Sequence, residues 1–589
     1  MIEAASRGAS VKRARIPGLS RRRLLQVLGA LGVGTLAFRQ ALAGQVAVGQ
    51  SVTTKAIRQA EWISGLSFTN EERELMLEDV NQALGNYARI RAVPLDNAVP
   101  PAILFFPDDP GAPRRAEERE AIVAGASPAA RRPASEDDLA FTPVTELAAL
   151  LRGRQVSSAE LTKLYLARLR RYDPLLHCVI NYTEESALKQ AERADREIAA
   201  GRYRGPLHGV PWGVKDLFAF PGYPTTWGAK PFKDQVRKEK ATVIARLEEA
   251  GAVLIAKLAV GALAWGDVWF GERTRNPWRP EQGSSGSSAG PAAAVAAGLA
   301  GFSIGTETLG SIVSPCTRCG ATGLRPTPGR VSRFGCMALS WTMDKVGPIA
   351  RSVEDCALVF GAIHGRDGLD HSLMDRPFEW PLRRDVRTLR VGYIESLYDE
   401  GRLDRIDDDQ RRERARARIE ASRKSLAVLR ELGFKLVPIE LPDKYPIAPL
   451  RLILTAEAAA TFDDLTRGGR DDELVRQVRN AWPNVFRAGQ LIPAVEYIRA
   501  NRIRTLLMGE MQRVMKDIDV YIAPTRGSSN LLLTNLTGHP TVVLPNGFRE
   551  NGTPTSVTFC GRLYGETELL AVASAYQQAS GFHLRRPPL

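Results

Sequence analysis

The sequence predicts an α/β fold from residue 141 to the end of the 589-residue chain, preceded by a mainly helical N-terminal extension. In the second part, short apolar segments typical of buried strands alternate with amphipathic helical stretches. Hydrophobic residues make up 44% of the chain, which is typical of globular proteins and excludes a disordered one. We therefore expect one large α/β domain over residues 141–589, an extension with a linker over residues 44–140, and a separate segment before them.

Residues 1–43 have the features of an export signal. The stretch "SRRRLLQ", Ser20 to Gln26, begins a mostly apolar run that ends in an A-x-A pattern at Ala41–Ala43. Paired arginines followed closely by two leucines indicate a twin-arginine (Tat-type) signal peptide. An uncleaved membrane anchor is the alternative, although the run is short and Gly-rich for a spanning helix. We expect a periplasmic or secreted bacterial protein with no stable membrane insertion after cleavage.

The basic charge of the chain does not indicate a nucleic-acid-binding protein. The formal net charge is +14, but the first 43 residues contain eight Lys or Arg and one acid, so half of the excess lies there. Elsewhere bases are opposed by acids, as in "DRIDDDQRRERARAR", which is typical of a solvated helix face. We expect no nucleic-acid partner.

The N-terminal extension contains one clear helix and a Pro-rich segment. "TNEERELMLEDVNQAL" predicts a helix that Asn70 caps, with Glu71 and Glu72 in its first turn. The segment "VPLDNAVPPAILFFPDDPGAP" and a charged linker follow.

The main domain opens with a helix and continues with strands. "SSAELTKLYLARLRRYDP" has Ser157 and Glu160 at capping-box spacing, and its apolar residues fall on one face. A second helix is expected to end at Gly433, just before a strand. The expected buried strands are "GVPWGV", "AVLIAK", "LRVGYI", "FKLVPIE" and "DVYIAP".

A serine-rich segment, "QGSSGSSAG" from Gln282 to Gly290, raises the question of a nucleophile. Composition alone favours a loop. Gly286–Gly290 fits the G-x-S-x-G nucleophile elbow, with Ser288 as the nucleophile, but that motif needs a strand immediately before it. The preceding "GERTRNPWRPEQGSS" predicts no strand, and "GPAAAVAAGLA" predicts a small-residue helix that begins near Pro291.

Three motifs together resemble the amidase signature family. "GVPWGVKDLF" matches the family's lysine segment, and "SGSSAGPAAAVAAGLAGFSIGTETLGSI" matches its two serine segments joined by a small-residue helix. In register, Lys215 takes the family lysine, Ser287 the first serine of its double serine, and Ser311 the last serine. The resemblance covers residues 141–589 and includes "MDKVGPIARSVEDCA" and "NLTGHPTVVLPNGF". It implies a large mixed β-sheet with helices on both faces.

The resemblance also implies a catalytic relay. Ser311 would attack an amide carbonyl, Ser287 would pass its proton on, and Lys215 would accept that proton as a neutral amine. Backbone N–H groups of the 308–311 turn would stabilise the oxyanion, with Gly286 and Ser288 as support, and the Gly286–Ser287 bond would be cis. The oxyanion residues are Thr308, Leu309, Gly310 and Ser311.

Five residues depart from the family pattern: Ser285, Ala289, Pro291, Leu309 and Val313. Other candidates are assigned structural roles. Leu309 replaces a glycine, and Val313 stands where many relatives carry arginine, which weakens any inference about substrate preference. His208 and Lys257 are expected to be structural, and Ser284 and Ser285 to be loop residues. Ser288 could orient the site or donate a backbone hydrogen bond. Core packing is favoured over an acyl pocket for Trp265, Trp269 and Phe270.

The sequence predicts hydrolysis of a small-molecule amide, with no metal and no organic cofactor. Two alternatives stay open: a glutaminase or amidotransferase-A-like subunit, and a catalytically silent binding protein on the same scaffold. An export signal argues against a subunit that acts on cytosolic tRNA. "CTRC" lacks a second ligand pair for zinc, and the sequence leaves open whether Cys316 and Cys319 are free. A homo-oligomer also remains open, as does the substrate.

Overall fold

The computed structural model describes residues 51–95, 99, 101–103, 130–525 and 528–589. The described residues form two compact units, which divide between Leu77 and Glu78. The expected signal peptide and most of the Pro-rich segment lie outside the described residues, and the expected boundaries near residues 43 and 140 stay predictions. The helices of the described segments are too short or too polar to cross a bilayer.

In the first unit, helix α3 (Thr54–Ser64) and the start of α4 (Asn70–Arg91) are joined by a buried ion pair of 2.7 Å between Arg73 and Glu61. The cap of α4 differs from the prediction by one residue. The Thr69 hydroxyl accepts a hydrogen bond from the Glu72 amide at 3.2 Å, and the Glu72 carboxylate accepts one from the Thr69 amide at 2.6 Å. This reciprocal pair is a capping box. The Asn70 side chain accepts from arginines instead.

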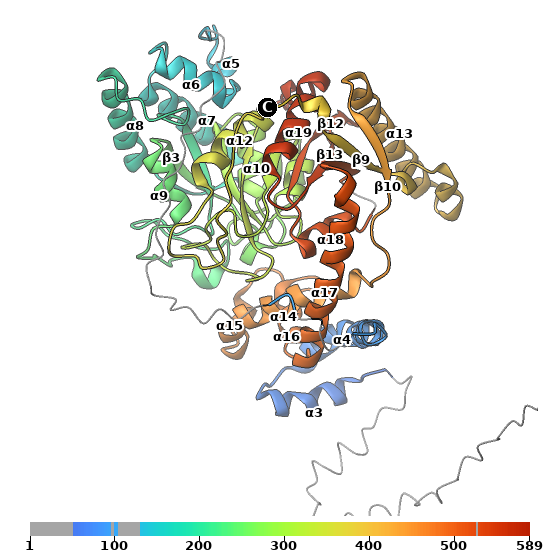
Figure 1. The fold of residues 1–589 in the computed structure, drawn as a ribbon. Helices are drawn as coiled ribbons and strands as arrows, with labels where there is room; N and C mark the ends of the chain where they lie inside the picture. Colours follow the sequence, from blue (N-terminus) through green and yellow to red (C-terminus); the bar gives the residue numbers. More distant parts are fainter. Residues whose placement is uncertain (1–50, 96–98, 100, 104–129, 526–527) are drawn as a thin grey trace, which may run out of the picture. The chain divides into compact units, whose positions relative to one another are not determined.

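The second unit is built on an 11-stranded mixed sheet, which confirms the predicted fold class (Figure 1). The strand order is β1-β3-β2-β6-β8-β7-β12-β13-β11-β9-β10. Strand β2 runs parallel to β3 and to β6, whereas β8 runs antiparallel to β6. The strands are β1 (Val179–Tyr182), β2 (Pro211–Lys215), β3 (Val253–Leu258), β6 (Phe302–Glu307), β7 (Thr322–Arg325), β8 (Lys345–Ala350), β9 (Arg390–Ile394), β10 (Lys435–Ile439), β11 (Val520–Pro524), β12 (Thr541–Phe548) and β13 (Pro554–Gly561).

Helices bury both faces of this sheet. Successive strand residues point to opposite faces: Leu254 packs into one apolar cluster, and its neighbours Val253 and Ile255 pack into another. Helices α9 (Thr242–Glu249), α12 (Val353–Ile363), α13 (Asp409–Glu431) and α19 (Glu566–Ser580) contribute to the first cluster. Helices α7 (Ser158–Leu176), α8 (Glu184–Ala199), α10 (Ala289–Ala296) and α11 (Val313–Cys319) contribute to the second.

A further group of helices lies beyond one end of the sheet (Figure 1). In this group, α14 (Leu452–Thr461) packs on both α16 (Trp482–Gly489) and α17 (Ala494–Val514). A 2.7 Å ion pair between Arg91 and Glu496 joins the end of α4 to α17. This group supplies part of the wall of the candidate site described below. The remaining helices are α5 (Glu136–Ala140), α6 (Val144–Arg152), α14 (Leu452–Thr461), α15 (Asp463–Arg467), α16 (Trp482–Gly489), α17 (Ala494–Val514) and α18 (Asn530–Thr537).

All five predicted strands form, with one correction. Strand β10 is half-exposed rather than buried, because it is the last strand of the sheet and has a neighbour on one side only. The Ser157 cap is confirmed, since its hydroxyl accepts from the Glu160 amide at 3.0 Å. The expected solvated helix is α13, most of whose residues are exposed.

Candidate active site

Lys215 ends strand β2, and Thr306 and Glu307 end the adjacent parallel strand β6. The carboxyl ends of parallel strands meet at one edge of a sheet, where ligand sites form. Lys215 is fully buried and its amine donates to three oxygens: Ser287 Oγ at 2.8 Å, Thr306 Oγ1 at 2.7 Å and Thr306 O at 3.3 Å. The structure thus brings together two residues that are 72 positions apart in the chain.

Burial lowers the pKa of Lys215 to about 7, against its usual value of 10.5. The nearby Cys336, Asp344 and Glu307 groups favour the charged form and only partly offset this effect. A substantial fraction of the amine is therefore neutral near pH 7, and a neutral amine can accept a proton from a hydroxyl.

Ser287 is fully buried, and the Gly286–Ser287 peptide bond before it is cis, as the resemblance implied. Glycine is required at 286, because a Cβ there would lie 1.8 Å from the carbonyl oxygen of Gly266. The next residue, Ser288, is also fully buried. Its hydroxyl donates to Thr306 O at 3.1 Å and accepts from Thr306 N at 3.3 Å. Ser288 therefore fastens the serine loop to β6.

Strand β5 (Arg279–Gly283) precedes the serine loop, where the sequence predicted no strand. It pairs only with the two-residue strand β4 (Arg275–Asn276), outside the main sheet. The nucleophile elbow needs a main-sheet strand and an exposed serine, so neither β5 nor the buried Ser288 fits it. The helix that follows, α10, begins two residues before the expected Pro291.

Ser311 lies in the turn between β6 and α11 and is 7% exposed. Gly310 has φ +85°, a left-handed conformation that favours glycine. Among the described residues, no protein acceptor receives the amides of Leu309, Gly310 or Ser311, so these N–H groups are free to bind an oxyanion. The Ser311 carbonyl accepts from the Ser288 amide at 3.1 Å, which ties the two serine segments together.

Glu307 holds this turn from beneath, a role that the sequence reasoning missed. One of its carboxylate oxygens accepts the amides of Ile312 and Val313, both at 2.9 Å. The other accepts from Arg325 at 2.8 Å and Asn535 at 2.9 Å. Burial alone would raise the pKa of Glu307, but the positive charges of Arg325 and Lys345 and the amide hydrogen bonds bring it to about 2. An acid four residues before the candidate nucleophile was the available signal.

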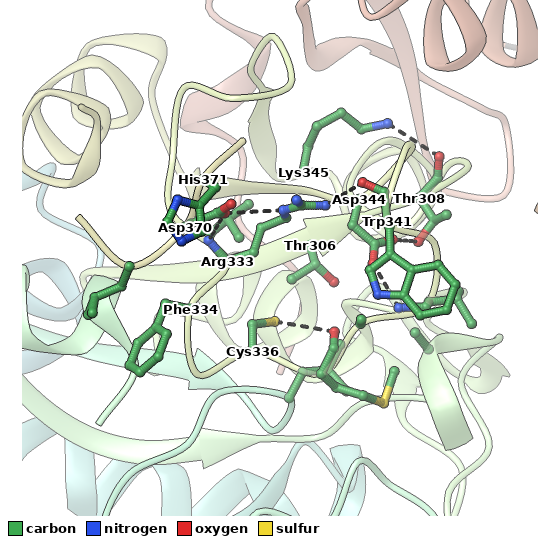
Figure 2. Close-up of a pocket in the computed structure, with 17 residues that line it drawn as sticks. Thr306, Thr308, Arg333, Phe334, Cys336, Trp341, Asp344, Lys345, Asp370 and His371 are labelled. Atoms are coloured by element: carbon green, nitrogen blue, oxygen red, sulfur yellow. Dashed lines mark hydrogen bonds and ion pairs between the residues drawn. The ribbon is translucent and has the colours of Figure 1, made fainter. Parts of the chain in front are cut away.

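Two neighbouring cavities reach this turn. The first has a volume of about 250 Å³, and Ser311, Gly286 and Leu309 are among its walls. The second has a volume of about 310 Å³ and lies on the lysine side, where Thr306 and Cys336 face it (Figure 2). Ala264, Thr308 and Leu339 line both. A substrate in the first cavity can reach Ser311, while Lys215 and Ser287 stay buried behind it.

The charged groups around the second cavity are paired with protein partners (Figure 2). Asp344 accepts from Thr308 Oγ1 at 2.6 Å and from two backbone amides. Arg333 contacts Asp370 at 3.3 Å, and Lys345 donates to Asn535 at 2.7 Å. These pairs leave little free charge for a ligand on this side.

Lys257 and His208 lie in contacts that fit the structural roles expected for them. Lys257 is fully buried, forms a 2.7 Å ion pair with Asp216 and donates to Pro224 O and Thr225 Oγ1 at 2.6 Å. His208 is buried, and its Nε2 lies 3.2 Å from Glu197. Burial lowers the pKa of His208, although Glu197 opposes this.

Some of the aromatic and loop residues near the site line the Ser311 cavity, and the others do not. Trp265 lines the Ser311 cavity and packs edge-on against Trp482 at 4.6 Å, so it is more than core packing. Trp269 is buried and packs against Phe270, as expected. Ser285 lines the Ser311 cavity, whereas Ser284 is buried and donates to the Ser285 carbonyl at 2.8 Å.

Cys316 and Cys319 are buried free thiols. No group of three or more His, Cys, Asp or Glu side chains placed to hold a metal ion occurs in the parts of the chain that the structure describes.

The family model described as Amidase matches residues 160–533. The chain belongs to the amidase signature family. Its 11-stranded mixed sheet matches solved structures of that family, including native peptide amidase from Stenotrophomonas maltophilia (30% identity, TM-score 0.64, covering 76% of this chain and 98% of that one). An amidase family protein from Bacillus anthracis str. Ames matches with 26% identity and a TM-score of 0.66, over 77% of this chain and 93% of the other. The chain is thus an amide-hydrolysing enzyme.

Among the relatives of this chain are proteins named as subunits of an amidotransferase. The glutamyl-tRNA(Gln) amidotransferase A subunit of Roseiflexus sp. (strain RS-1) is 35% identical over 480 residues, which are 75% of this chain and 96% of the relative. This similarity supports the amidotransferase-A-like alternative better than a free-standing amide hydrolase.

Proposed function

We propose that this amidase hydrolyses a carboxylic amide through an acyl-enzyme on Ser311, with Ser287 as the proton relay and Lys215 as the base. The observation that carries this proposal is the buried Lys215 amine bonded to Ser287 Oγ at 2.8 Å. A serine hydroxyl is a weak nucleophile and needs a base. The lowered pKa of Lys215 supplies one near neutral pH.

The reaction then proceeds in two halves. Lys215 accepts a proton from Ser287, Ser287 accepts the Ser311 proton, and Ser311 Oγ forms a bond to the amide carbonyl carbon. The free amides of Leu309, Gly310 and Ser311 stabilise the oxyanion. The C–N bond breaks as Ser287 returns a proton to the leaving nitrogen, and Lys215 reprotonates Ser287. Water repeats these steps on the acyl-enzyme and releases the acid.

Labelling with an uncharged fluorophosphonate, alongside amide turnover, tests this assignment. Ser311→Ala should abolish labelling and turnover, and Ser287→Ala should slow both by several orders of magnitude. Ser284→Ala should retain most activity, which controls for the serine-rich loop. Loss of labelling in Ser288→Ala together with intact labelling in Ser311→Ala would reject the proposal. An unlabelled wild type would favour a silent binding protein.

A second candidate function is that of an amidotransferase A subunit, which would release ammonia from an amide for a partner subunit. The similarity to glutamyl-tRNA(Gln) amidotransferase A subunits over most of their length favours it. Copurification of the tagged chain from its own host tests it: stable partner subunits and glutamine-dependent ammonia release would support this function. A chain recovered alone, with no glutaminase activity, would contradict it.

We also propose that residues 1–43 direct export through a Tat-type pathway. The twin arginines and the A-x-A pattern support this proposal. It conflicts with an amidotransferase role, because charged tRNA is cytosolic, so localisation separates the two functions.

A further inference from the structure

The wall of the Ser311 cavity carries one conspicuous cation. Among the described residues that line this cavity, Arg451 alone is charged. Arg451 ends a short 3₁₀ segment, Ala448–Arg451, directly before α14. Its neighbours Leu450 and Leu452 are buried, whereas the Arg451 side chain is exposed. The backbone is therefore anchored on both sides of an arginine at the substrate cavity.

Within the described part of the chain, the Arg451 side chain forms no ion pair or hydrogen bond, unlike the other cations near the site. The described residues place neither a carboxylate nor a side-chain hydrogen-bond acceptor against it. Arg333 and Lys345, in the neighbouring cavity, are occupied by Asp370 and Asn535. A guanidinium stays protonated and presents paired donors that match a carboxylate.

The other walls of the cavity are mainly apolar and include Trp265, Leu309, Leu454, Trp482 and Val485. A charge-assisted hydrogen bond is stronger beside such walls than in open water. The lining residues that the structure describes include no Asp or Glu, so the cavity offers an ammonium group no counter-charge. The volume of about 250 Å³ suits a small substrate.

We propose that Arg451 binds a carboxylate on the amide substrate, so that the enzyme acts on small amides with a free carboxylate and an apolar spacer. This inference rests on the proposed function, since it assigns the substrate class to the Ser311 cavity. It disfavours free glutamine, whose α-ammonium would enter the cavity without a partner. An N-acylated or ammonium-free carboxylate fits better.

Calorimetric binding to the Ser311→Ala variant tests the inference without turnover. One arm compares the p-nitroanilide of glutaric acid, with its carboxylate on the acyl side, with its methyl ester. The other compares N-butanoyl-4-aminobenzoate, with its carboxylate on the amine side, with its methyl ester. We expect the carboxylate to bind roughly tenfold more tightly than the ester in at least one pair. Adding Arg451→Gln should erase that preference, and Arg451→Lys should restore part of it.

Arg476→Gln is the matched control. Arg476 is a half-buried arginine that lines an adjoining small cavity and donates to the Asn480 carbonyl at 3.1 Å. Its removal should leave the preference intact. Equal binding of acid and ester in both pairs, no binding of any of the four compounds, or a preference that depends on Arg476 would overturn the inference. Failure of the serine mechanism is read separately, from fluorophosphonate labelling of Ser311→Ala.

Discussion

A lysine acts as a base only when its amine is neutral, and the surroundings of Lys215 favour that form. The amine is fully buried and its hydrogen-bond partners are hydroxyl and carbonyl oxygens rather than a carboxylate. Lys257 is also buried near a strand end, but its amine lies 2.7 Å from the Asp216 carboxylate. Burial lowers the pKa of Lys257 as well, but the direct ion pair with Asp216 opposes that lowering. The partner, more than burial, separates a candidate base from a structural cation.

The pH profile tests this reasoning. The pKa of Lys215 is lowered to about 7, so the neutral, active amine accumulates as the pH rises through that value. We expect kcat/KM to rise with pH and to level off on the alkaline side of neutrality. Lys215→Ala should remove this limb with most of the activity, and Lys215→Arg should not rescue it, because guanidinium stays protonated.

His208→Ala is the control for that profile, because His208 contacts Glu197 rather than either serine segment. It should retain the alkaline limb. An active Lys215→Ala enzyme with the same limb would show that another group is the base.

The backbone around Gly286 is packed too closely to accept a larger residue, which leads to a second prediction. A methyl group at 286 would lie 1.8 Å from Gly266 O, so Gly286→Ala must displace the loop that carries Ser287. We expect a loss of at least about 1–3 kcal/mol in the free energy of unfolding and the loss of most labelling. Thermal unfolding measures the loss of stability, and fluorophosphonate labelling measures the loss of nucleophile reactivity. Gly85→Ala, where a Cβ meets nothing within 4 Å, should do neither; equal effects at both positions would contradict the packing argument.

Four strands and helices converge on the carboxylate of Glu307. The residue ends β6, and it binds the first turn of α11, Arg325 of β7 and Asn535 of α18. Lys345 of β8 lies opposite Glu307 in the sheet register. The nucleophile turn is thus fixed by the sheet and not by the loop alone, so its amides are held in place before a substrate arrives.

This network predicts a defined acid sensitivity. The pKa of Glu307 is lowered from 4.5 to about 2, so its ionised form contributes stability above pH 4.5 that is lost as the pH falls toward 2. The contribution is on the order of 3 kcal/mol. Urea unfolding of the wild type and Glu307→Gln at pH 7, 4.5 and 3 should show a difference that narrows with acid. Glu185→Gln, at an exposed ion pair with Lys189, should show little difference at any pH. A constant gap for Glu307→Gln would contradict the prediction.

The elements that the sequence predicted correctly are those with strong local signals. Apolar runs gave β2, β3, β9 and β11, and the Ser157 spacing gave the cap of α7. The incorrect predictions concern strands whose structure depends on which other strands they pair with. The run at residues 435–439 forms a strand, but its edge position depends on the order of the whole sheet. Strand β5 forms from a segment with two charged residues and a proline, because a short neighbouring strand pairs with it.

The same division holds for the candidate site within the whole molecule. Lys215, Ser287 and Ser311 stand in short motifs, so the sequence could name them, although their catalytic roles stay predictions. Asn535 lies 228 positions from Glu307 in the chain. Trp482, at the start of α16, packs against Trp265. Those contacts arise only when the chain has folded and the helices α14–α17 pack beside the end of the sheet. No local pattern indicates them, and this is why Arg451 was missed.

The compartment of the chain is the remaining prediction, and it bears on which relatives share its role. The twin arginines and the A-x-A end predict a mature protein that begins at Gly44 and lies outside the cytoplasm. Fractionation of a Tat-competent host, followed by N-terminal sequencing, measures both. Replacing Arg21 and Arg22 with lysine should retain the precursor inside, while replacing Arg7 and Lys12 should leave export unchanged. A full-length wild type in the cytoplasm would contradict export and remove the main argument against an amidotransferase role. An exported chain would have no access to charged tRNA, and free hydrolysis of a small amide would then be the function consistent with its location.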